Sequence, residues 1–402
     1  MPPKILFVCS EFPPGPGGIG THAYQLATQL NQLGWSPAVL TAQDYAPPQE
    51  IETFNQAQPF PVVRFRSLPT SPIKAVQRWT ILRHWLKTWK PDIVLATGER
   101  MVWVAAAACK QHRIPLVAIG HGTEFGLTSF WEKALMIWSY QQAAMVACVS
   151  EYTQQTMREQ GIRPQASCVI PNGADAGRFQ LLPGESSQRL RAQIGLSDSK
   201  LLLTVGNVTD RKGQEVVVRA LPHIVKECPD AHYLMCGLPT EKKKLLALAE
   251  TLGVADHLHF LGRVSNDTLV ELINACDVFL MTSCRTATGD FEGYGIAVVE
   301  AALCGKPAVI SDSGGLPEVV LNGETGFVVP ERDEIATASA VLTLLKDPSR
   351  LKAAGEAARQ RALREQTWAH RVKEYDSLLQ NVLGDITAAS EPLTTQGSSR
   401  IR

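Results

Sequence analysis

The sequence predicts an α/β protein of two domains in tandem, each a parallel β-sheet with helices on both faces. Short apolar runs alternate with amphipathic stretches along most of the chain, which is the pattern of parallel α/β sheets. A strand–turn–helix start occurs twice, once at Lys4 and again at Lys200. The chain has 402 residues, which is longer than one hydrophobic core usually spans.

The first predicted domain, residues 1–183, opens with an apolar strand at 4–9, a glycine- and proline-rich loop to Gly20 and an amphipathic helix at 21–33. Further strand-like runs lie at 37–41, 61–65, 93–96, 116–119, 145–149 and 167–170. Their aliphatic composition favours strands that are buried on both faces of a sheet.

The second predicted domain, residues 184–366, follows an irregular stretch that begins at Pro171-Asn172-Gly173. Its strand-like runs lie at 200–205, 232–236, 258–261, 278–281, 308–310 and 326–329. Helical patterns cover 335–345 and 348–379, and a last helix that begins within the latter is expected at 367–385. The polar segment 386–402 is expected to be disordered.

Composition excludes several classes of protein. The 39 basic and 39 acidic residues balance, so no nucleic-acid partner is expected. The nine cysteines are scattered without a C-x-x-C pair, which is typical of buried thiols in a reducing compartment. Neither a signal-peptide pattern nor an apolar run of membrane-spanning length is evident. We expect a cytoplasmic protein, soluble or peripheral at the inner face of a membrane.

The strongest functional pattern joins Glu292 and Glu300 through a glycine-rich turn and an apolar helix start. A helix N-terminus presents unpaired N–H groups and a positive dipole end, which suit phosphates and sugar hydroxyls. Two glutamates with seven residues between them would by themselves favour a solvated surface turn. The glycines at 293 and 295 and the later turn at 313–318 favour a binding site.

Glu292-x7-Glu300, the two glycines and the trailing Gly305-Lys306-Pro307 resemble the donor-site motif of retaining glycosyltransferases of family 4, the group 1 glycosyltransferases. The resemblance extends over nearly all of residues 4–385. It implies the GT-B fold, in which two Rossmann-like domains face each other across a cleft. It also implies transfer of a hexosyl group from a nucleoside-diphosphate sugar to an acceptor hydroxyl, with retention of configuration.

The donor-loop stretch 286–295 somewhat resembles GDP-mannose-using mannosyltransferases, so mannose is the favoured sugar and glucose the second. The acceptor implied is a sugar or a lipid-linked molecule, in glycan, glycolipid or polysaccharide synthesis.

The family is generally independent of a bound metal and needs no cofactor. The donor loop agrees, because it lacks a separate D-x-D-like acidic pair. In the family's mechanism the leaving phosphate oxygen accepts the acceptor's proton, so no enzyme nucleophile is required.

The resemblance also implies roles for individual residues. Glu300 would bind the ribose hydroxyls and Glu292 the ring hydroxyls of the sugar. The diphosphate would be held by Lys212 and by the helix start at Gly293, Tyr294, Gly295 and Ile296. His121, directly after a strand, would reach the transferred sugar, although a structural, hydrogen-bonded histidine is the alternative. Glu124 is a weaker candidate that would face the acceptor.

The turn 206–213 matches the family's diphosphate turn with one departure. The arginine expected directly after the first glycine is Asn207 here. Arg211 is the candidate substitute, and a solvated basic side chain is the alternative. Gly18 in the first loop would lie near the donor diphosphate, and Arg263 near the nucleobase. Asn172 belongs to a hinge segment whose role is expected to be mainly structural.

Two other classes of protein are weighed against this interpretation. A Rossmann oxidoreductase would need a G-x-G-x-x-G fingerprint with an acidic residue about twenty positions later, and neither domain has one. A non-catalytic nucleotide-sugar-binding protein of the same fold stays open because of Asn207.

Segment 76–90 has three tryptophans among lysines and arginines and contains no acidic residue. A basic amphipathic helix with tryptophans suits a peripheral contact with an anionic membrane. The alternative is a helix that covers the sheet and turns its tryptophans into the core.

Overall fold

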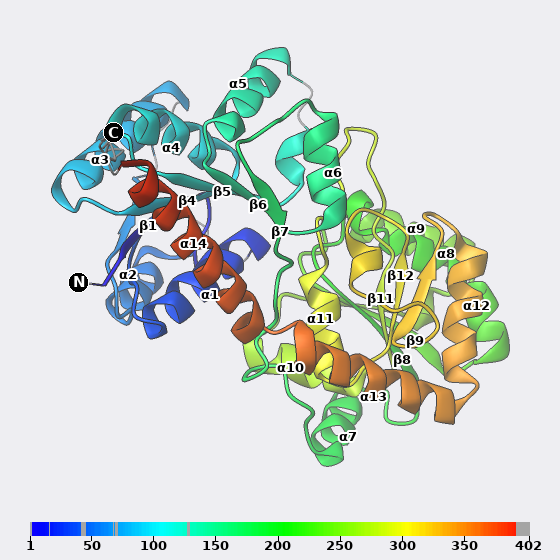
Figure 1. The fold of residues 1–402 in the computed structure, drawn as a ribbon. Helices are drawn as coiled ribbons and strands as arrows, with labels where there is room; N and C mark the ends of the chain where they lie inside the picture. Colours follow the sequence, from blue (N-terminus) through cyan, green and yellow to red (C-terminus); the bar gives the residue numbers. More distant parts are fainter. Residues whose placement is uncertain are drawn as a thin grey trace, which may run out of the picture.

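Two parallel β-sheets, one in each half of the chain, form the frame of the protein (Figure 1). The computed structural model describes residues 2–15, 17–41, 46–66, 68, 71–126 and 129–390. The first sheet has the strand order β3-β2-β1-β4-β5-β6-β7 and the second β10-β9-β8-β11-β12-β13. This arrangement confirms the expected fold class of two Rossmann-like domains.

Each strand expected from the sequence is present, and its ends differ from the expected ones by one residue at most. The first sheet comprises β1 (Lys4–Cys9), β2 (Ser36–Thr41), β3 (Val62–Arg64), β4 (Ile93–Thr97), β5 (Leu116–Gly120), β6 (Met145–Cys148) and β7 (Ser167–Val169). The second comprises β8 (Lys200–Val205), β9 (Ala231–Cys236), β10 (Leu258–Gly262), β11 (Val278–Met281), β12 (Ala308–Ser311) and β13 (Gly326–Val329).

Helices cover both faces of each sheet. In the first half these are α1 (Gly18–Gln32), α2 (Pro48–Gln56), α3 (Ser71–Thr88), α4 (Glu99–His112), α5 (Phe130–Gln141) and α6 (Glu151–Glu159). In the second half they are α7 (Gly184–Gln193), α8 (Gln214–Glu227), α9 (Lys242–Thr251), α10 (Asn266–Ala275), α11 (Ile296–Leu303), α12 (Glu334–Leu345), α13 (Pro348–Glu365) and α14 (Trp368–Ser390).

Side chains along β1 show why its sequence is apolar from Ile5 to Cys9. Leu6 and Val8 point into the core cluster beneath α3, α4 and α5, whereas Ile5 and Phe7 point into the cluster that contains α1 and α14. Successive side chains of a strand face opposite sides, so a strand covered on both sides has no polar positions.

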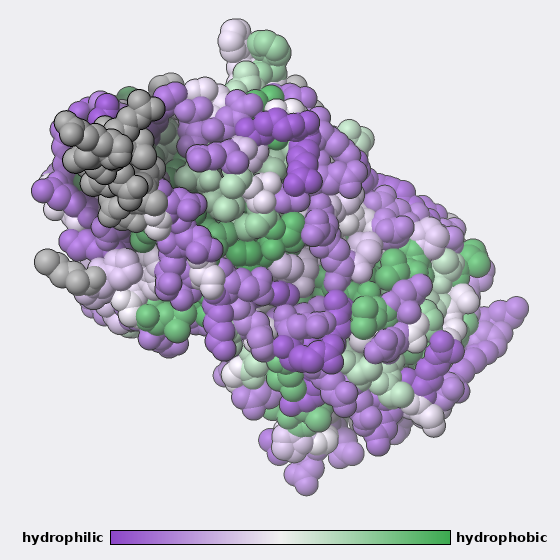
Figure 2. Space-filling view, in the orientation of Figure 1, coloured by the Kyte–Doolittle hydropathy of each residue, from purple (hydrophilic) through white to green (hydrophobic). Residues whose placement is uncertain are grey.

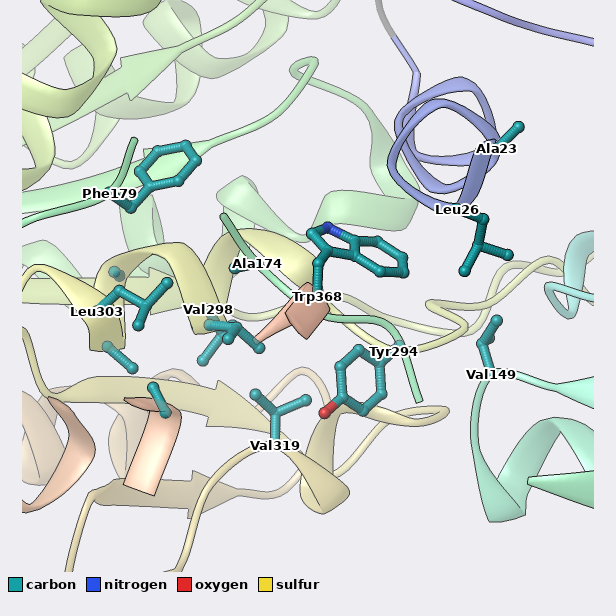
Figure 3. Packing of buried hydrophobic residues seen from close by; sticks show 14 of the residues in the cluster. Ala23, Leu26, Val149, Ala174, Phe179, Tyr294, Val298, Leu303, Val319 and Trp368 are labelled. Atoms are coloured by element: carbon teal, nitrogen blue, oxygen red, sulfur yellow. The ribbon is translucent and has the colours of Figure 1, made fainter. Parts of the chain in front are cut away.

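Helix α14 crosses from the second domain back to the first, where it packs against α1. The crossing is held by backbone hydrogen bonds: the Ala174 N–H donates to the Gln366 carbonyl (3.0 Å) and the Trp368 N–H donates to the Ala174 carbonyl (3.1 Å). Figure 3 shows the buried Trp368 ring between Ala174 and Leu26 of α1. The crossing therefore ties both domains to the hinge segment.

The C-terminal segment differs from expectation. Residues 386–390 were expected to be disordered, but α14 continues through Ser390. This stretch contains neither glycine nor proline, so nothing in it interrupts the helix. Residues 391–402 of the expected tail lie outside the described residues.

Helix α3 contains most of the tryptophan-rich segment, and Trp89 follows directly after the helix. Leu82 and Leu86 are buried, and Trp79, Trp85 and Trp89 are partly buried against the same core cluster. This packing supports the sheet-covering interpretation of residues 76–90. Among the described residues, no helix combines the length and apolarity that crossing a membrane requires.

Trp368→Ala should destabilise the protein strongly, because it empties a site where the native side chain is only 2% exposed. Such truncations typically cost about 3–5 kcal/mol. Thermal unfolding measures the effect, with Trp131→Ala as the matched control, since Trp131 is 79% exposed. Equal melting temperatures for the two variants would contradict the role given to the crossing.

Candidate functional site

A cleft of about 560 Å³ lies between the two domains and is lined by residues of both. Eleven of the residues expected from the sequence line it: Gly18, His121, Asn207, Arg211, Lys212, Glu292, Gly293, Tyr294, Gly295, Ile296 and Glu300. Arg263 is exposed and is not among the lining residues. Segments far apart in the sequence thus converge on one site.

Glu292 is the electrostatic centre of the cleft. Its Oε2 atom accepts hydrogen bonds from Lys212 Nζ (2.6 Å) and Arg211 Nη1 (2.7 Å). Arg211 Nε also lies 3.2 Å from Asp290 Oδ2. Burial alone would raise the pKa of Glu292, but the two cations outweigh it and lower the pKa to about 2. The carboxylate is therefore ionised at neutral pH, and both cations are held beside it before a ligand binds.

The turn after β8 directs Lys212 into the cleft. It continues into a single 3₁₀ turn, Asp210–Lys212, that ends at Gly213 in the left-handed region (φ 64°). Asn207 helps to fix this turn, because its Oδ1 accepts the Leu238 N–H (3.1 Å) and its carbonyl accepts from Gln214 (3.1 Å). Asn207 thus stabilises the loop, while Arg211 brings a guanidinium to the cleft.

The glycines of the donor loop permit close approach between the domains. A Cβ at position 293 would collide with the backbone oxygen of His121. Gly295 is the N-cap of α11 with φ 98°, and no side chain caps the helix there. The first N–H groups of α11 are therefore open to an anion. Tyr294 offers only its backbone, because its ring is 3% exposed and its hydroxyl points toward Val319 (Figure 3).

Glu300 lies on α11 toward the hinge end of the cleft. Burial raises its pKa to about 7, and the nearby charge of Arg178 opposes this rise. Arg178 Nη2 also donates to Asn266 Oδ1 (2.8 Å), and both residues line the cleft. Neither was expected from the sequence, since an isolated arginine in a hinge segment has no distinctive spacing.

His121 lines the cleft and is also hydrogen-bonded to the protein. Its Nε2 lies 2.7 Å from Thr97 Oγ1, and its ring meets the buried His22 ring edge to face at 5.1 Å. Burial lowers the pKa of His121 to about 4, so the imidazole is neutral at neutral pH. His22 in turn lies 3.1 Å from the Tyr375 hydroxyl on α14. The two interpretations of His121, as a hydrogen-bonded structural residue and as a contact of the transferred sugar, are therefore compatible.

Glu124 does not face an acceptor, and that expectation is wrong. The side chain is buried, and its Oε1 accepts the His121 N–H (2.7 Å) and the Tyr140 hydroxyl (2.9 Å). Burial raises the pKa of Glu124, and these hydrogen bonds oppose the rise. A carboxyl group that would be costly to bury alone instead holds the loop that presents His121.

Two further polar side chains line the cleft from the first domain and the hinge. Glu11 follows β1, and burial raises its pKa against a hydrogen bond from Gly20. Asn172 is 6% exposed, and its Oδ1 has no hydrogen-bond partner among the described residues. A buried, unpaired amide oxygen suits a ligand hydroxyl. The lack of a partner for this oxygen could be recognised only in the structure, because it depends on the packing around the hinge.

Lys212→Met should weaken nucleoside-diphosphate binding by about 1.5–3 kcal/mol, the usual value of a charge-assisted hydrogen bond. Arg211→Met should weaken it less, since Arg211 also pairs with Asp290. Calorimetric titration measures both, with Lys244→Met as control, because Lys244 is 54% exposed on α9. If Lys212→Met binds as well as the control variant, Lys212 does not contact the diphosphate.

Comparisons with known proteins agree with this geometry. The model of glycosyl transferases group 1 matches residues 186–361, and that of glycosyltransferase family 4 matches residues 16–178. The chain is 31% identical to a GDP-mannose-dependent alpha-(1-6)-phosphatidylinositol monomannoside mannosyltransferase of Mycolicibacterium smegmatis, over 93% of this chain and 98% of the relative. It is 26% identical to a glycogen synthase of Mycobacterium tuberculosis, with 91% of each chain covered.

Solved structures show the same fold. Anabaena Alr3699/HepE in complex with UDP and glucose matches with a TM-score of 0.79 at 23% identity, covering 94% of this chain and 99% of that one. Sucrose-phosphate synthase from Thermosynechococcus elongatus matches with a TM-score of 0.80 at 20% identity, covering 97% and 100%. These likenesses show the GT-B arrangement of two domains.

Proposed function

The chain belongs to the group 1 glycosyltransferases, and on this premise we propose that it transfers a mannosyl group from GDP-mannose to an acceptor hydroxyl with retention of configuration. Four of the relatives compared are named as GDP-mannose-dependent mannosyltransferases, which supports this sugar. The observation that carries the proposal is the ion cluster of Glu292, Lys212 and Arg211 beside the open N-terminus of α11.

The diphosphate would bind between the two cations and the first turn of α11. Glu292 and Asp290 offset the charges of Lys212 and Arg211, so the diphosphate would be attracted by the N–H donors of the two cations and by the helix dipole. These groups would also stabilise the charge that develops on the departing GDP, where fixed charges contribute most. We propose that this charge stabilisation replaces a metal ion, so that turnover persists in EDTA.

We propose that the transferred sugar keeps its anomeric configuration without a covalent bond to an enzyme nucleophile. The candidate carboxylate, Glu292, is tied to two cations, and a pKa of about 2 makes it a weak base and nucleophile. His121, neutral at neutral pH, would hydrogen-bond a sugar hydroxyl rather than donate a full charge. The departing phosphate oxygen would then accept the proton from the acceptor on the same face of the sugar.

The acceptor would enter from the side of the first domain, where Glu11 lines the cleft. We propose a lipid-linked polyol or mannoside at the inner face of a membrane. The support is that relatives at 28–31% identity are named for phosphatidylinositol monomannoside acceptors. A purely binding function is not favoured, because Arg211 brings a second cation to the cleft although position 207 is an asparagine.

Glu300→Ala should weaken GDP binding, whereas Glu292→Ala should retain most GDP affinity and lose mannosyl transfer. The reason is that Glu300 would contact the ribose, and Glu292 the hexose and the cations that meet the leaving group. Calorimetry with GDP and a radiolabelled GDP-mannose transfer assay separate the two effects, with UDP-glucose as comparison donor. Two variants with wild-type GDP affinity and turnover would contradict the proposed function.

GDP affinity should fall as the pH decreases from 8 to 6. The free protein has a Glu300 pKa of about 7, so protons compete with the ribose hydroxyls for this carboxylate below that value. The Glu300→Gln variant is the matched control. The phosphate groups of GDP titrate in the same way with either protein, whereas the variant has no carboxylate at this position. The wild type should lose more affinity than Glu300→Gln over this range. If the GDP affinities of the two proteins change equally with pH, protonation of Glu300 does not affect binding of the ribose.

A further inference from the structure

His22 lies in the second turn of α1 and is fully buried. Its Nε2 atom lies 3.1 Å from the hydroxyl oxygen of Tyr375 on α14. Its ring meets the rings of Trp368 and Tyr375 edge to face, with centroids 5.4 and 5.6 Å away. The same ring also meets that of His121 edge to face at 5.1 Å. His22 therefore joins helix α14 to a residue that lines the cleft.

The four rings of this cluster come from both domains. His22 and His121 belong to the first domain, whereas Trp368 and Tyr375 belong to α14, which crosses from the second domain and packs against α1 (Figure 1). The face of the molecule in this view is mainly hydrophilic (Figure 2), whereas all four rings are buried. Of the four, only His121 lines the cleft. The crossing helix thus packs against the residue behind His121.

The two ring nitrogens of His22 differ in their contacts. Nε2 pairs with the Tyr375 hydroxyl, but the buried Nδ1 has no hydrogen-bond partner among the described residues. A phenyl ring would fill the same space without leaving a buried nitrogen unpaired, which has a free-energy cost. Filling the core therefore does not account for a histidine here. The hydrogen bond to Tyr375 does, because it fixes the rotation of the imidazole about its soft Cβ–Cγ bond.

The ring of His121 is held by one hydrogen bond, between Nε2 and Thr97 Oγ1 (2.7 Å). This bond leaves Nδ1 for a sugar hydroxyl, but by itself it allows the ring to tilt. The edge-to-face contact with His22 supplies a second constraint. Burial lowers the pKa of both imidazoles, so both rings are neutral at neutral pH and do not repel each other.

We propose that His22 is a positioning residue for mannosyl transfer: held by Tyr375, it orients the ring of His121 toward the transferred sugar. The inference rests on the proposed function, in which His121 hydrogen-bonds a sugar hydroxyl. It adds that α14, which follows the second domain in the sequence, sets the angle of a side chain that the first domain presents to the cleft. Orientation matters because a misplacement of about 1 Å can slow a reaction about a hundredfold.

Transfer kinetics of the full chain test the proposal with His22→Ala and with Tyr375→Phe, which removes only a hydroxyl group. Both variants should have a lower kcat, by roughly tenfold or more for His22→Ala. Both should keep the wild-type GDP affinity, since neither residue lines the cleft. The matched control is Leu30→Ala, which opens a cavity at a buried position about two turns further along α1. It should lower the melting temperature but keep the wild-type kcat when assayed below that temperature.

A second readout does not depend on activity. ¹⁵N NMR of the His121 imidazole, assigned by the loss of its signals in His121→Gln, reports which ring nitrogen carries the proton. The wild type should show one predominant tautomer, fixed by the bond to Thr97. His22→Ala and Tyr375→Phe should show exchange between tautomers, whereas Leu30→Ala should resemble the wild type. Tyr375→Phe keeps its ring and packing, so this comparison decides the question even if His22→Ala does not fold.

The proposal is overturned if Tyr375→Phe leaves both kcat and the His121 signals unchanged, or if Leu30→Ala lowers kcat as much as His22→Ala does. A loss of GDP affinity in either ring variant would also overturn it, because the effect would then extend to the whole cleft. A wild type that binds GDP but does not transfer mannose would contradict the proposed function alone. The NMR comparison would still decide whether His22 orients His121.

Discussion

The structure of the cleft depends on one partly buried ion cluster, in which Glu292 holds Lys212 and Arg211. The carboxylate would be costly to bury alone, and the two cations would repel each other without it. Together they fix both positive charges beside the N-terminus of α11 before any ligand arrives. Such preorganisation is the arrangement that best stabilises charge appearing during a reaction, because no reorganisation is then needed.

The same loops that hold this cluster also join the domains. Within the second domain the Gly315 N–H donates to the Glu292 carbonyl (2.9 Å), and across the domain boundary Gly293 abuts the backbone oxygen of His121. The carboxylate of Glu318 accepts the N–H groups of Glu151 and Tyr152 (both 3.0 Å), which caps α6 from the opposite domain. Contacts that join the domains therefore involve the same loops that form the site, and the glycines permit the close approach.

Local patterns predicted much of this architecture, because burial on both faces makes a strand's sequence apolar throughout. The glycine-rich turn and the spacing of Glu292 and Glu300 likewise indicated the site. Long-range contacts were not predictable: His22 meets Tyr375 across 353 residues, and Glu124 is turned inward by Tyr140. Tryptophan composition also does not reveal orientation, since Trp138 packs onto the core whereas Trp131 on the same helix is exposed.

A crystal structure of the protein with GDP-mannose tests the central claim most directly. The account predicts the diphosphate within hydrogen-bond distance of Lys212 Nζ and of the first N–H groups of α11. It further predicts the ribose at Glu300 and the hexose between Glu292 and His121. A nucleotide bound elsewhere, such as the hollow between α7 and α10 lined by Arg191 and Lys306, would contradict the account.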